Sequence, residues 1–349
     1  MARVLLRCAL DTFTGYGNDG VGLARALDKV CDLRVSPYGV VPPLPQEVAD
    51  LFIRERFSQT DLTLIHADPF AVTKWADQLK RRSALLVGWT MWEFESITSM
   101  KGHSKLKRKY QPFDTFLLYS QLTNRALSPH IPKKTAKHVV QGGYSSEFWT
   151  QEPSQERDWT APFRFCMVGQ LHERKDPFVA LAAWDILREE YGPSWDATLH
   201  LKTQTRHLHP KIEERYPGVK IHYAMWSPQQ LLDFYHYCHV YLAPSRGEGK
   251  NVPALEAQTT GIPVIATKYG GHENWMNDDW SWSVKYTLQG ADYGMCAKAD
   301  AQDLAEKMAF AYENRGAVRE KGRIASEVIP VMLDWNAIVP RVLELLEVS

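Results

Sequence analysis

The sequence has few cysteines, no net charge and no long apolar run, and each shortage argues against a class of protein. The five cysteines among 349 residues lie far apart and form no Cys-x-x-Cys pair, which argues against a disulfide framework and a zinc site. Lys plus Arg equals Asp plus Glu at 41 each, so no overall field favours nucleic acid or a charged membrane. No stretch approaches the roughly 20 apolar residues that span a bilayer. We therefore expect a globular, cytoplasmic protein without a bound metal.

The length favours two folded domains, because 349 residues exceed the usual size of one domain. Short apolar stretches alternate with helical segments, which is typical of an α/β protein with a mainly parallel sheet covered on both faces. The first series of strands is predicted at residues 4–10, 33–37, 62–66, 84–89, 115–120 and 137–141, with a helix at 20–28. The apolar run at the start is broken by Arg7, so it predicts a buried strand rather than a secretion signal.

A second series follows a polar connector at residues 150–162. Its strands are predicted at 165–169, 198–202, 219–223, 240–243 and 263–267, and its helices at 177–191, 228–238, 253–260 and 301–314. The predicted domains are therefore 1–150 and 151–330, followed by a helix at 331–349 that crosses back to the first domain. Carboxyl ends of parallel strands from both sheets would face a central cleft, which is the expected site.

Three motifs lie where strands end. The first is the glycine-rich stretch GYGNDGVG at residues 15–22, which follows the first strand and opens a helix. Glycines let the backbone turn tightly and expose amide groups to an anion. The spacing is not Gly-x-Gly-x-x-Gly, so a turn without a ligand stays an alternative.

The second motif is the stretch FCMVGQLHERKD at residues 165–176, where a strand and a glycine turn precede two cations. Arg174 and Lys175 could neutralise a diphosphate, and Gly169 would let the backbone approach it. A solvated basic turn is the alternative interpretation.

The third motif is the most informative, because seven residues separate the two glutamates Glu248 and Glu256. Glu248 lies in a loop after an apolar strand, and Glu256 lies on the helix that Pro253 can start. Two carboxylates that face one cleft suit a ligand with many hydroxyl groups, such as a ribose and a sugar. The amides of Gly249, Lys250 and Asn251 stand where a helix N-terminus would hold a phosphate.

With this pair the chain resembles the glycogen synthase-like retaining glycosyltransferases of the GT-B type, whose members carry a Glu-x7-Glu motif. The resemblance covers nearly the whole chain and includes, in order, the glycine-rich loop, VVQGGYSSEFW, VGQLHERKD, SPQQLLDFYHYCHVYLAPSRGEG, TTGIPVIATKYGG and the terminal helix with Trp335. It implies the GT-B fold of two Rossmann-like domains and a nucleotide-sugar donor, most commonly a UDP-sugar. It also implies transfer without a metal or a further cofactor.

The resemblance assigns roles to individual residues. Lys175, helped by Arg174, would contact the donor phosphates, Glu248 the donor sugar and Glu256 the ribose. Gly17 would face the diphosphate from the first domain, and Gly271 belongs to the backbone turn around the sugar phosphate. Gln170 departs from the family pattern, which usually has an arginine there.

The acceptor side is less defined by the sequence. The family's usual histidine is absent from the stretch VGWTMWE at residues 87–93, so His66 is a possible substitute, although a lone histidine at a strand end is more often structural. Trp92 and Glu93 are acceptor candidates, since an indole stacks on a sugar and a carboxylate holds a hydroxyl. Core tryptophans beside a surface acid are the equal alternative. The lysines and arginine from Lys101 to Lys109 form a basic cluster that could bind an anionic lipid or nucleic acid, or be a solvated helix face.

These expectations combine into a retaining glycosyltransferase that moves a sugar from a nucleotide donor to an acceptor hydroxyl. Two alternatives stay open: an inverting GT-B transferase or epimerase, and a non-catalytic nucleotide-sugar-binding module. The first alternative needs a positioned side-chain base, and the second would not preserve both glutamates.

Overall fold

The structure is a computed structural model. It describes residues 1–10, 15–39, 44, 46–53, 57–151, 156–204, 211–291 and 294–348. The chain divides into two compact units: unit 1 comprises Met1–Ser145, Ala291–Met295 and Val331–Ser349, and unit 2 comprises Ser146–Gly290 and Cys296–Pro330. The sequence placed the changes of domain after residues 150 and 330, and the structure places them after 145 and 330, with the short segment 291–295 added to unit 1.

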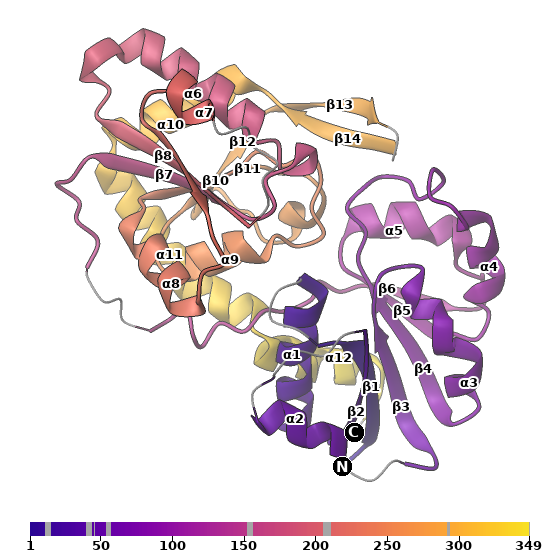
Figure 1. The fold of residues 1–349 in the computed structure, drawn as a ribbon. Helices are drawn as coiled ribbons and strands as arrows, with labels where there is room; N and C mark the ends of the chain where they lie inside the picture. The colour runs from indigo at the N-terminus through magenta and orange to yellow at the C-terminus, as the bar shows by residue number, and fades with distance from the viewer. Residues whose placement is uncertain are drawn as a thin grey trace. The chain divides into compact units, whose positions relative to one another are not determined.

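Unit 1 is built on a six-stranded sheet in the order β2-β1-β3-β4-β5-β6, in which every neighbouring pair is parallel (Figure 1). Its strands are β1 (Arg3–Ala9), β2 (Asp32–Tyr38), β3 (Thr60–His66), β4 (Ser83–Thr90), β5 (Thr115–Leu118) and β6 (Ala136–Val139). Its helices are α1 (Gly15–Asp28), α2 (Gln46–Ile53), η1 (Ala71–Trp75), α3 (Ala76–Lys80), η2 (His103–Lys105), α4 (Leu106–Lys109), α5 (Gln121–Leu127), η3 (Ser128–His130) and α12 (Trp335–Leu345).

Each face of this sheet has its own apolar core, because successive side chains of a strand point to opposite faces. One core joins Val4 and Leu6 of β1 to Leu23 of α1 and to Trp335 and Val342 of α12. The other core joins β3, β4 and β5 to η1, α3, α4 and α5. The terminal helix α12 therefore packs on α1 within unit 1.

Unit 2 is built on a second six-stranded parallel sheet, in the order β12-β11-β10-β7-β8-β9. Its strands are β7 (Phe163–Val168), β8 (Ala197–Thr203), β9 (Val219–Tyr223), β10 (Val240–Ala243), β11 (Val264–Thr267) and β12 (Ser281–Val284). Its helices are η4 (Glu173–Lys175), α6 (Pro177–Tyr191), η5 (Gly192–Ser194), α7 (Ile212–Arg215), α8 (Pro228–Tyr237), α9 (Val252–Thr259), η6 (Gly270–Asn274) and α10 (Ala301–Glu313). The predicted α/β class with two parallel sheets is confirmed.

Three features of the second half were not predicted from the sequence. Strand β12 completes the sheet, and β13 (Tyr286–Ala291) pairs with β14 (Gly294–Ala299) in a separate two-stranded sheet. Helix α11 (Arg315–Leu333) carries Pro330 inside it, where the chain passes from unit 2 to unit 1. An internal proline normally ends a helical prediction, so Pro330 would at most have ended a predicted helix near its last turn.

The predicted connector lies within the start of unit 2, where a half-buried arginine fixes it. Arg157 donates hydrogen bonds to the carbonyls of Cys238 at 2.7 Å and Thr260 at 3.0 Å. These carbonyls lie at the ends of α8 and α9, so the guanidinium satisfies acceptors that the helices themselves leave open. None of the helices in the described part of the chain is both long and apolar enough to cross a membrane.

Candidate active site

The strand order of unit 2 brings two loops together at the carboxyl ends of its central strands. The chain builds β8 and β9 on one side of β7 and then returns to build β10, β11 and β12 on the other side. Such a reversal opens a crevice beyond the carboxyl ends of the two middle strands, where ligands bind in open α/β sheets. The loops that follow β7 and β10 carry the second and third sequence motifs, so the topology itself places them side by side.

Glu248, in the loop after β10, lies between the two predicted cations. Its Oε2 is 2.8 Å from Nη1 of Arg174 and its Oε1 is 2.6 Å from Nζ of Lys175. Arg174 also donates to the carbonyl of Gly247 at 2.9 Å. Burial alone would raise the pKa of Glu248, but the charges of Lys175 and Arg174 outweigh it and hold that pKa well below its usual range. The carboxylate is therefore ionised throughout the physiological range.

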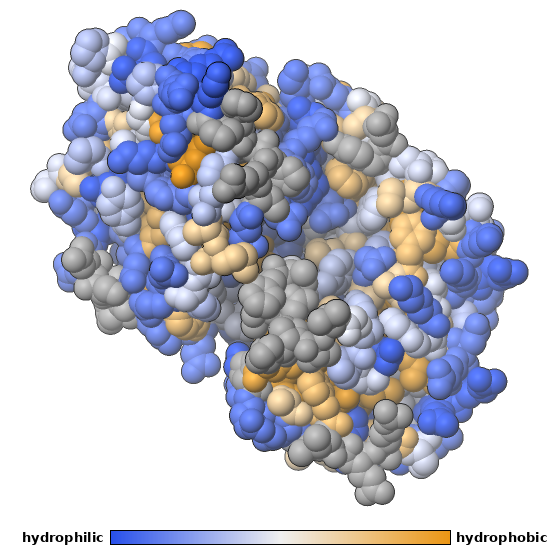
Figure 2. All heavy atoms as spheres, viewed as in Figure 1, coloured by the Kyte–Doolittle hydropathy of each residue, from blue (hydrophilic) through white to orange (hydrophobic). Residues whose placement is uncertain are grey.

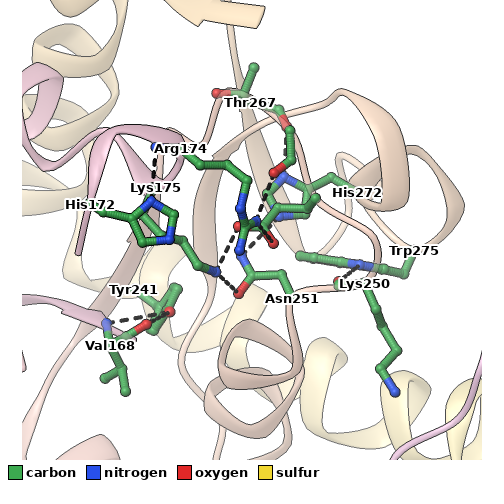
Figure 3. Close-up of polar contacts among 12 residues, drawn as sticks. Val168, His172, Arg174, Lys175, Tyr241, Lys250, Asn251, Thr267, His272 and Trp275 are labelled. Carbon is green, nitrogen blue, oxygen red and sulfur yellow. Dashed lines mark hydrogen bonds and ion pairs between the residues drawn. The ribbon is translucent and has the colours of Figure 1, made fainter. Parts of the chain in front are cut away.

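A second layer of hydrogen bonds holds this cluster in place (Figure 3). Nζ of Lys175 donates to Oδ1 of Asn251 at 3.1 Å, and Asn251 Nδ2 lies 2.9 Å from Nε2 of His272. Nδ1 of His272 lies 2.7 Å from the carbonyl of Thr267, which can only accept. Nδ1 therefore carries the proton, Nε2 accepts from the amide, and Oδ1 of Asn251 is left facing Lys175.

His272 is neutral in this arrangement. Its ring is fully buried, and burial lowers its pKa to about 4 against the opposing charge of Glu248. The residue thus orients Asn251 without adding a third positive charge to the cluster. Asn251 has φ = 68°, a left-handed conformation that asparagine tolerates better than most residues, and it stands immediately before the first residue of α9.

Two glycines keep the backbone close around the cluster. A side chain at Gly271 would place its Cβ 2.2 Å from the carbonyl oxygen of Gly249, and the Gly271 amide donates to the carbonyl of Glu248 at 2.7 Å. Gly169 has φ = 139°, which side chains of L-residues rarely adopt. Both positions therefore require glycine for steric reasons, independently of any ligand.

Glu256 lies on α9 in a different electrostatic environment. The hydroxyl of Tyr235 donates to its Oε2 at 3.2 Å. Burial raises the pKa of Glu256 to about 7, against the hydrogen bond from Tyr235 and the charges of Lys250 and Lys202. The two glutamates of the motif therefore differ in kind: Glu248 is ionised, and Glu256 exchanges its proton near neutral pH.

The glycine-rich stretch of unit 1 forms a helix instead of the predicted turn. Helix α1 already begins at Gly15, and Gly17 is buried inside it. A Cβ at Gly20 would lie 2.0 Å from the carbonyl oxygen of Ala9, and one at Gly22 would lie 2.3 Å from the ring of Trp335. These glycines therefore let α1 approach β1 and α12 closely. The contact between Gly17 and a diphosphate stays a prediction.

The acceptor candidates lie in unit 1 and are mostly buried. The ring of His66 is fully buried, and its Nε2 lies 2.6 Å from the hydroxyl of Tyr119, which donates to Oδ2 of Asp19 at 3.1 Å. Trp92 is 8% exposed, and its indole donates to the carbonyl of Ser96. Glu93 is half-buried. In this arrangement His66 and Trp92 contribute to the interior of unit 1, and none of the three is shown to contact an acceptor.

Several residues of the site in unit 2 were not predicted as members of it: His272, Tyr235 and Lys202. Each could have been found, because His272 directly follows the Gly270–Gly271 turn, Tyr235 lies in the stretch quoted before Glu248, and Lys202 lies near the carboxyl end of β8. Among the residues that the structure describes, no group of three or more His, Cys, Asp or Glu side chains could hold a metal ion.

The part of the chain that matches a known protein family lies mainly in unit 2. Residues 162–314 match the family described as glycosyl transferases group 1. A stretch of 120 residues is 32% identical to the D-inositol 3-phosphate glycosyltransferase of Corynebacterium urealyticum, and it covers 30% of this chain and 26% of that relative. The match thus spans about a quarter of the curated relative.

Solved structures resemble the whole chain. HepE of Anabaena in complex with UDP and glucose has a TM-score of 0.66 at 14% identity, over 99% of this chain and 100% of that one. A glycosyltransferase of Rickettsia africae gives 0.70 at 14% identity over 99% and 97%, and a sucrose-phosphate synthase of Thermosynechococcus elongatus gives 0.68 at 14% over 99% and 98%. Residues 162–314 are therefore similar to a glycosyl transferases group 1 domain, and the chain has the GT-B fold of these solved structures.

Proposed function

We propose that the protein transfers a sugar from a nucleotide-sugar donor, most commonly a UDP-sugar, to an acceptor hydroxyl with retention of anomeric configuration. The observation that carries the proposal is the buried carboxylate of Glu248 held between Arg174 and Lys175 beside the start of α9. A leaving diphosphate needs concentrated positive charge, and a hexose needs fixed hydrogen-bond acceptors. The cluster supplies both at the carboxyl ends of β7 and β10 in unit 2.

Arg174 and Lys175 would stabilise the charge that develops on the diphosphate as the bond to the sugar breaks. The backbone amides of Gly249, Lys250 and Asn251 precede α9, whose first turn contains no acidic residue, so the positive end of the helix adds to the same field. With this much positive charge from the protein, the reaction needs no metal ion and no further cofactor. HepE, described in complexes with UDP and with UDP-glucose, supports a uridine donor for this chain as well.

Glu248 would change partners when the donor binds. In the chain without donor it balances the charges of Arg174 and Lys175. The diphosphate would share those cations, so the carboxylate could accept hydrogen bonds from hydroxyl groups of the donor sugar. Glu256, 6% exposed on α9, would accept from the ribose diol.

The alternatives differ in what they require of the site. An inverting transferase or an epimerase needs a side-chain base at the reacting centre. His272, which acts electrostatically on Glu248, has both ring nitrogens engaged, by Thr267 and Asn251. A binding module without activity would also use these cations, because they attract the diphosphate of an intact donor. Transfer is favoured by the likeness to glycosyltransferases, and cleavage of the donor is the observation that separates the two functions.

The test is a panel of UDP-, GDP- and ADP-sugars, each assayed for thermal stabilisation and for hydrolysis without an acceptor. The proposal expects a saturable shift with a uridine donor in the wild type, a much weaker shift in Glu256→Ala, and an unchanged one in Glu306→Ala, a matched control at an exposed glutamate of α10. Hydrolysis should persist in EDTA, and the sugar released or transferred should keep the anomeric configuration of the donor by NMR. Binding without hydrolysis or transfer would favour the binding module, and inverted product would exclude retention.

A further inference from the structure

One part of unit 1 has a net positive charge, although the full chain has a net charge of zero. Residues 97–140 contain nine Lys and Arg against one acidic residue, Asp114, whereas the totals of the full chain are equal. Both carboxylate oxygens of Asp114 accept from the ammonium of Lys80, and one also accepts from the amide of Leu86. Arg125 pairs with Glu95 at 3.4 Å. Eight basic residues remain after these pairs are set aside.

These eight residues form what we call the cationic face: Lys101, Lys105, Lys107, Arg108, Lys109, Lys133, Lys134 and Lys137. All are exposed, and none makes an ion pair with any other residue in the described part of the chain. The inward side of α4 is fixed, because Leu106 and Tyr110 are fully buried in the core of unit 1. The charged side chains of this short helix are therefore held outward.

The two stretches of the cationic face meet at η3. The ring of His103 in η2 lies 6.2 Å from the ring of His130 in η3, in an edge-on arrangement. Lys137 on β6 donates to Oγ of Ser128 at 3.3 Å, so the edge strand also joins η3. Figure 2 shows strongly hydrophilic side chains over the edge of unit 1 where Figure 1 places α4. The cationic face thus comprises α4, η3 and β6, with η3 beside both of the others.

The composition of this face distinguishes between anionic partners. Seven of its eight cations are lysines, which act as point charges, whereas base-specific readout of nucleic acid relies on the forked guanidinium of arginine. The aromatic residues Tyr110, Phe113 and Phe116 are buried, so they cannot stack on unpaired bases. Met100 and Val139 are exposed apolar side chains, 38% and 36% accessible, next to Lys101 and near Lys137. Cations interspersed with exposed apolar side chains match the headgroup region of a bilayer.

We propose that the cationic face binds membrane surfaces rich in anionic lipid, with the cations on headgroup phosphates or carboxylates and Met100 and Val139 at the acyl boundary. The interaction is peripheral and electrostatic, so it weakens as salt shortens the screening length. Each basic residue near such a surface strengthens binding roughly fivefold. The proposal is independent of the transfer reaction, since it concerns a surface of unit 1 that includes no residue of the donor site.

The test is co-sedimentation of the full chain with sucrose-loaded vesicles of phosphatidylcholine alone or with one-third phosphatidylserine. We expect binding to the anionic vesicles only, lost in 0.5 M salt. The triple variant Lys105→Gln, Lys107→Gln, Lys109→Gln should bind about 100-fold more weakly. The matched triple variant Lys211→Gln, Lys220→Gln, Lys298→Gln removes the same charge from exposed positions of unit 2 and should bind like the wild type. Because all six lysines are exposed, both variants should keep the melting temperature of the wild type.

A second variant separates lipid from nucleic acid. Met100→Ser with Val139→Thr should weaken vesicle binding severalfold and leave any binding to a DNA duplex or single strand unchanged. Tighter binding to DNA than to the anionic vesicles would overturn the assignment to lipid. Equal binding by the two triple variants, or no binding to anionic vesicles at low salt, would overturn the proposal that the cationic face binds membranes.

Discussion

The two units use similar parallel sheets to build different interiors at the carboxyl ends of their strands. In unit 2 this region holds four charged groups, with the carboxylate of Glu248 between two cations and Glu256 nearby. In unit 1 the same region holds the rings of His66, Tyr119 and Trp89, with Asp19 as the buried acid. The strand ends thus have similar backbones and different side chains: unit 2 places two cations beside its buried acid, and unit 1 places aromatic rings there.

This difference shows what the fold contributes and what the side chains contribute. A reversal of strand order opens a crevice in either sheet, between β7 and β10 in unit 2 and between β1 and β3 in unit 1. Buried charges persist only where they are paired, and unit 2 pairs them through Glu248. The paired cluster of unit 2 contains cations that can exchange one anion for another, whereas the rings of unit 1 surround the acid Asp19 with a hydrogen bond from Tyr119. Substitutions in the two units should therefore have different consequences.

The largest expected effect is a slower cleavage of the donor, caused by a substitution in unit 2. Lys175→Gln should lower the rate of donor cleavage about 10²- to 10³-fold, because one charge that stabilises the leaving diphosphate is lost. Steady-state rates of hydrolysis or transfer measure it, with Lys298→Gln as a control at an exposed lysine of the same unit. A rate equal to that of the control would remove Lys175 from the mechanism.

The next effect concerns the backbone around the cluster. Gly271→Ala should destabilise unit 2 by roughly 1–3 kcal/mol, because its Cβ would meet the carbonyl oxygen of Gly249 at 2.2 Å. Donor affinity should fall with it. Gly316→Ala meets nothing within 4 Å and should stabilise helix α11 by about 0.5 kcal/mol. Thermal melts with and without UDP measure both, and equal shifts in the two variants would contradict the steric argument.

A smaller effect should appear as a dependence on pH. Because the pKa of Glu256 is raised to about 7, donor affinity should rise about tenfold between pH 6 and pH 8 as the carboxylate ionises to accept from the ribose. Glu256→Gln should flatten this profile. The raised pKa also means that Glu256 contributes most to stability at low pH and that this contribution is lost as the pH rises through about 7. A wild-type binding curve independent of pH would contradict the role given to this residue.

The smallest effect is expected in unit 1. Tyr119→Phe removes the hydroxyl between His66 and Asp19, which should cost about 1 kcal/mol of stability and lower the melting temperature by a few degrees. Burial, with the charge of Asp19, raises the pKa of Tyr119 well above its ordinary value, so the hydroxyl is protonated at any working pH. Donor affinity should not change. A parallel loss of donor affinity would show that the two units are not independent in this respect.

Much of the fold could be predicted from the sequence, because alternation of apolar strands with amphipathic helices is a local pattern. Strands β9 and β10 and helix α6 have the predicted bounds. Strand β12 was missed because its residues Ser281–Val284 include two serines and a half-buried tryptophan, which give no apolar run. Strand β13 is mostly exposed and β14 buries only the small residues Cys296, Ala297 and Ala299, so neither has the apolar pattern of a buried strand. The glycines of α1 predicted a turn, since glycine is unfavourable in helices and only close packing on β1 and α12 explains it there.

By itself, the sequence determined the α/β class and the residues of the motif around Glu248 and Glu256, because both depend on the types and spacing of neighbouring residues. Only the tertiary structure decided that Arg174 and Lys175 both pair with Glu248, that His272 is neutral and orients Asn251, and that the two glutamates have opposite pKa shifts. The physical reason is that charge pairing and burial are properties of distance in space. Residues 175, 248 and 272 are far apart along the chain, and the order of the strands brings them together.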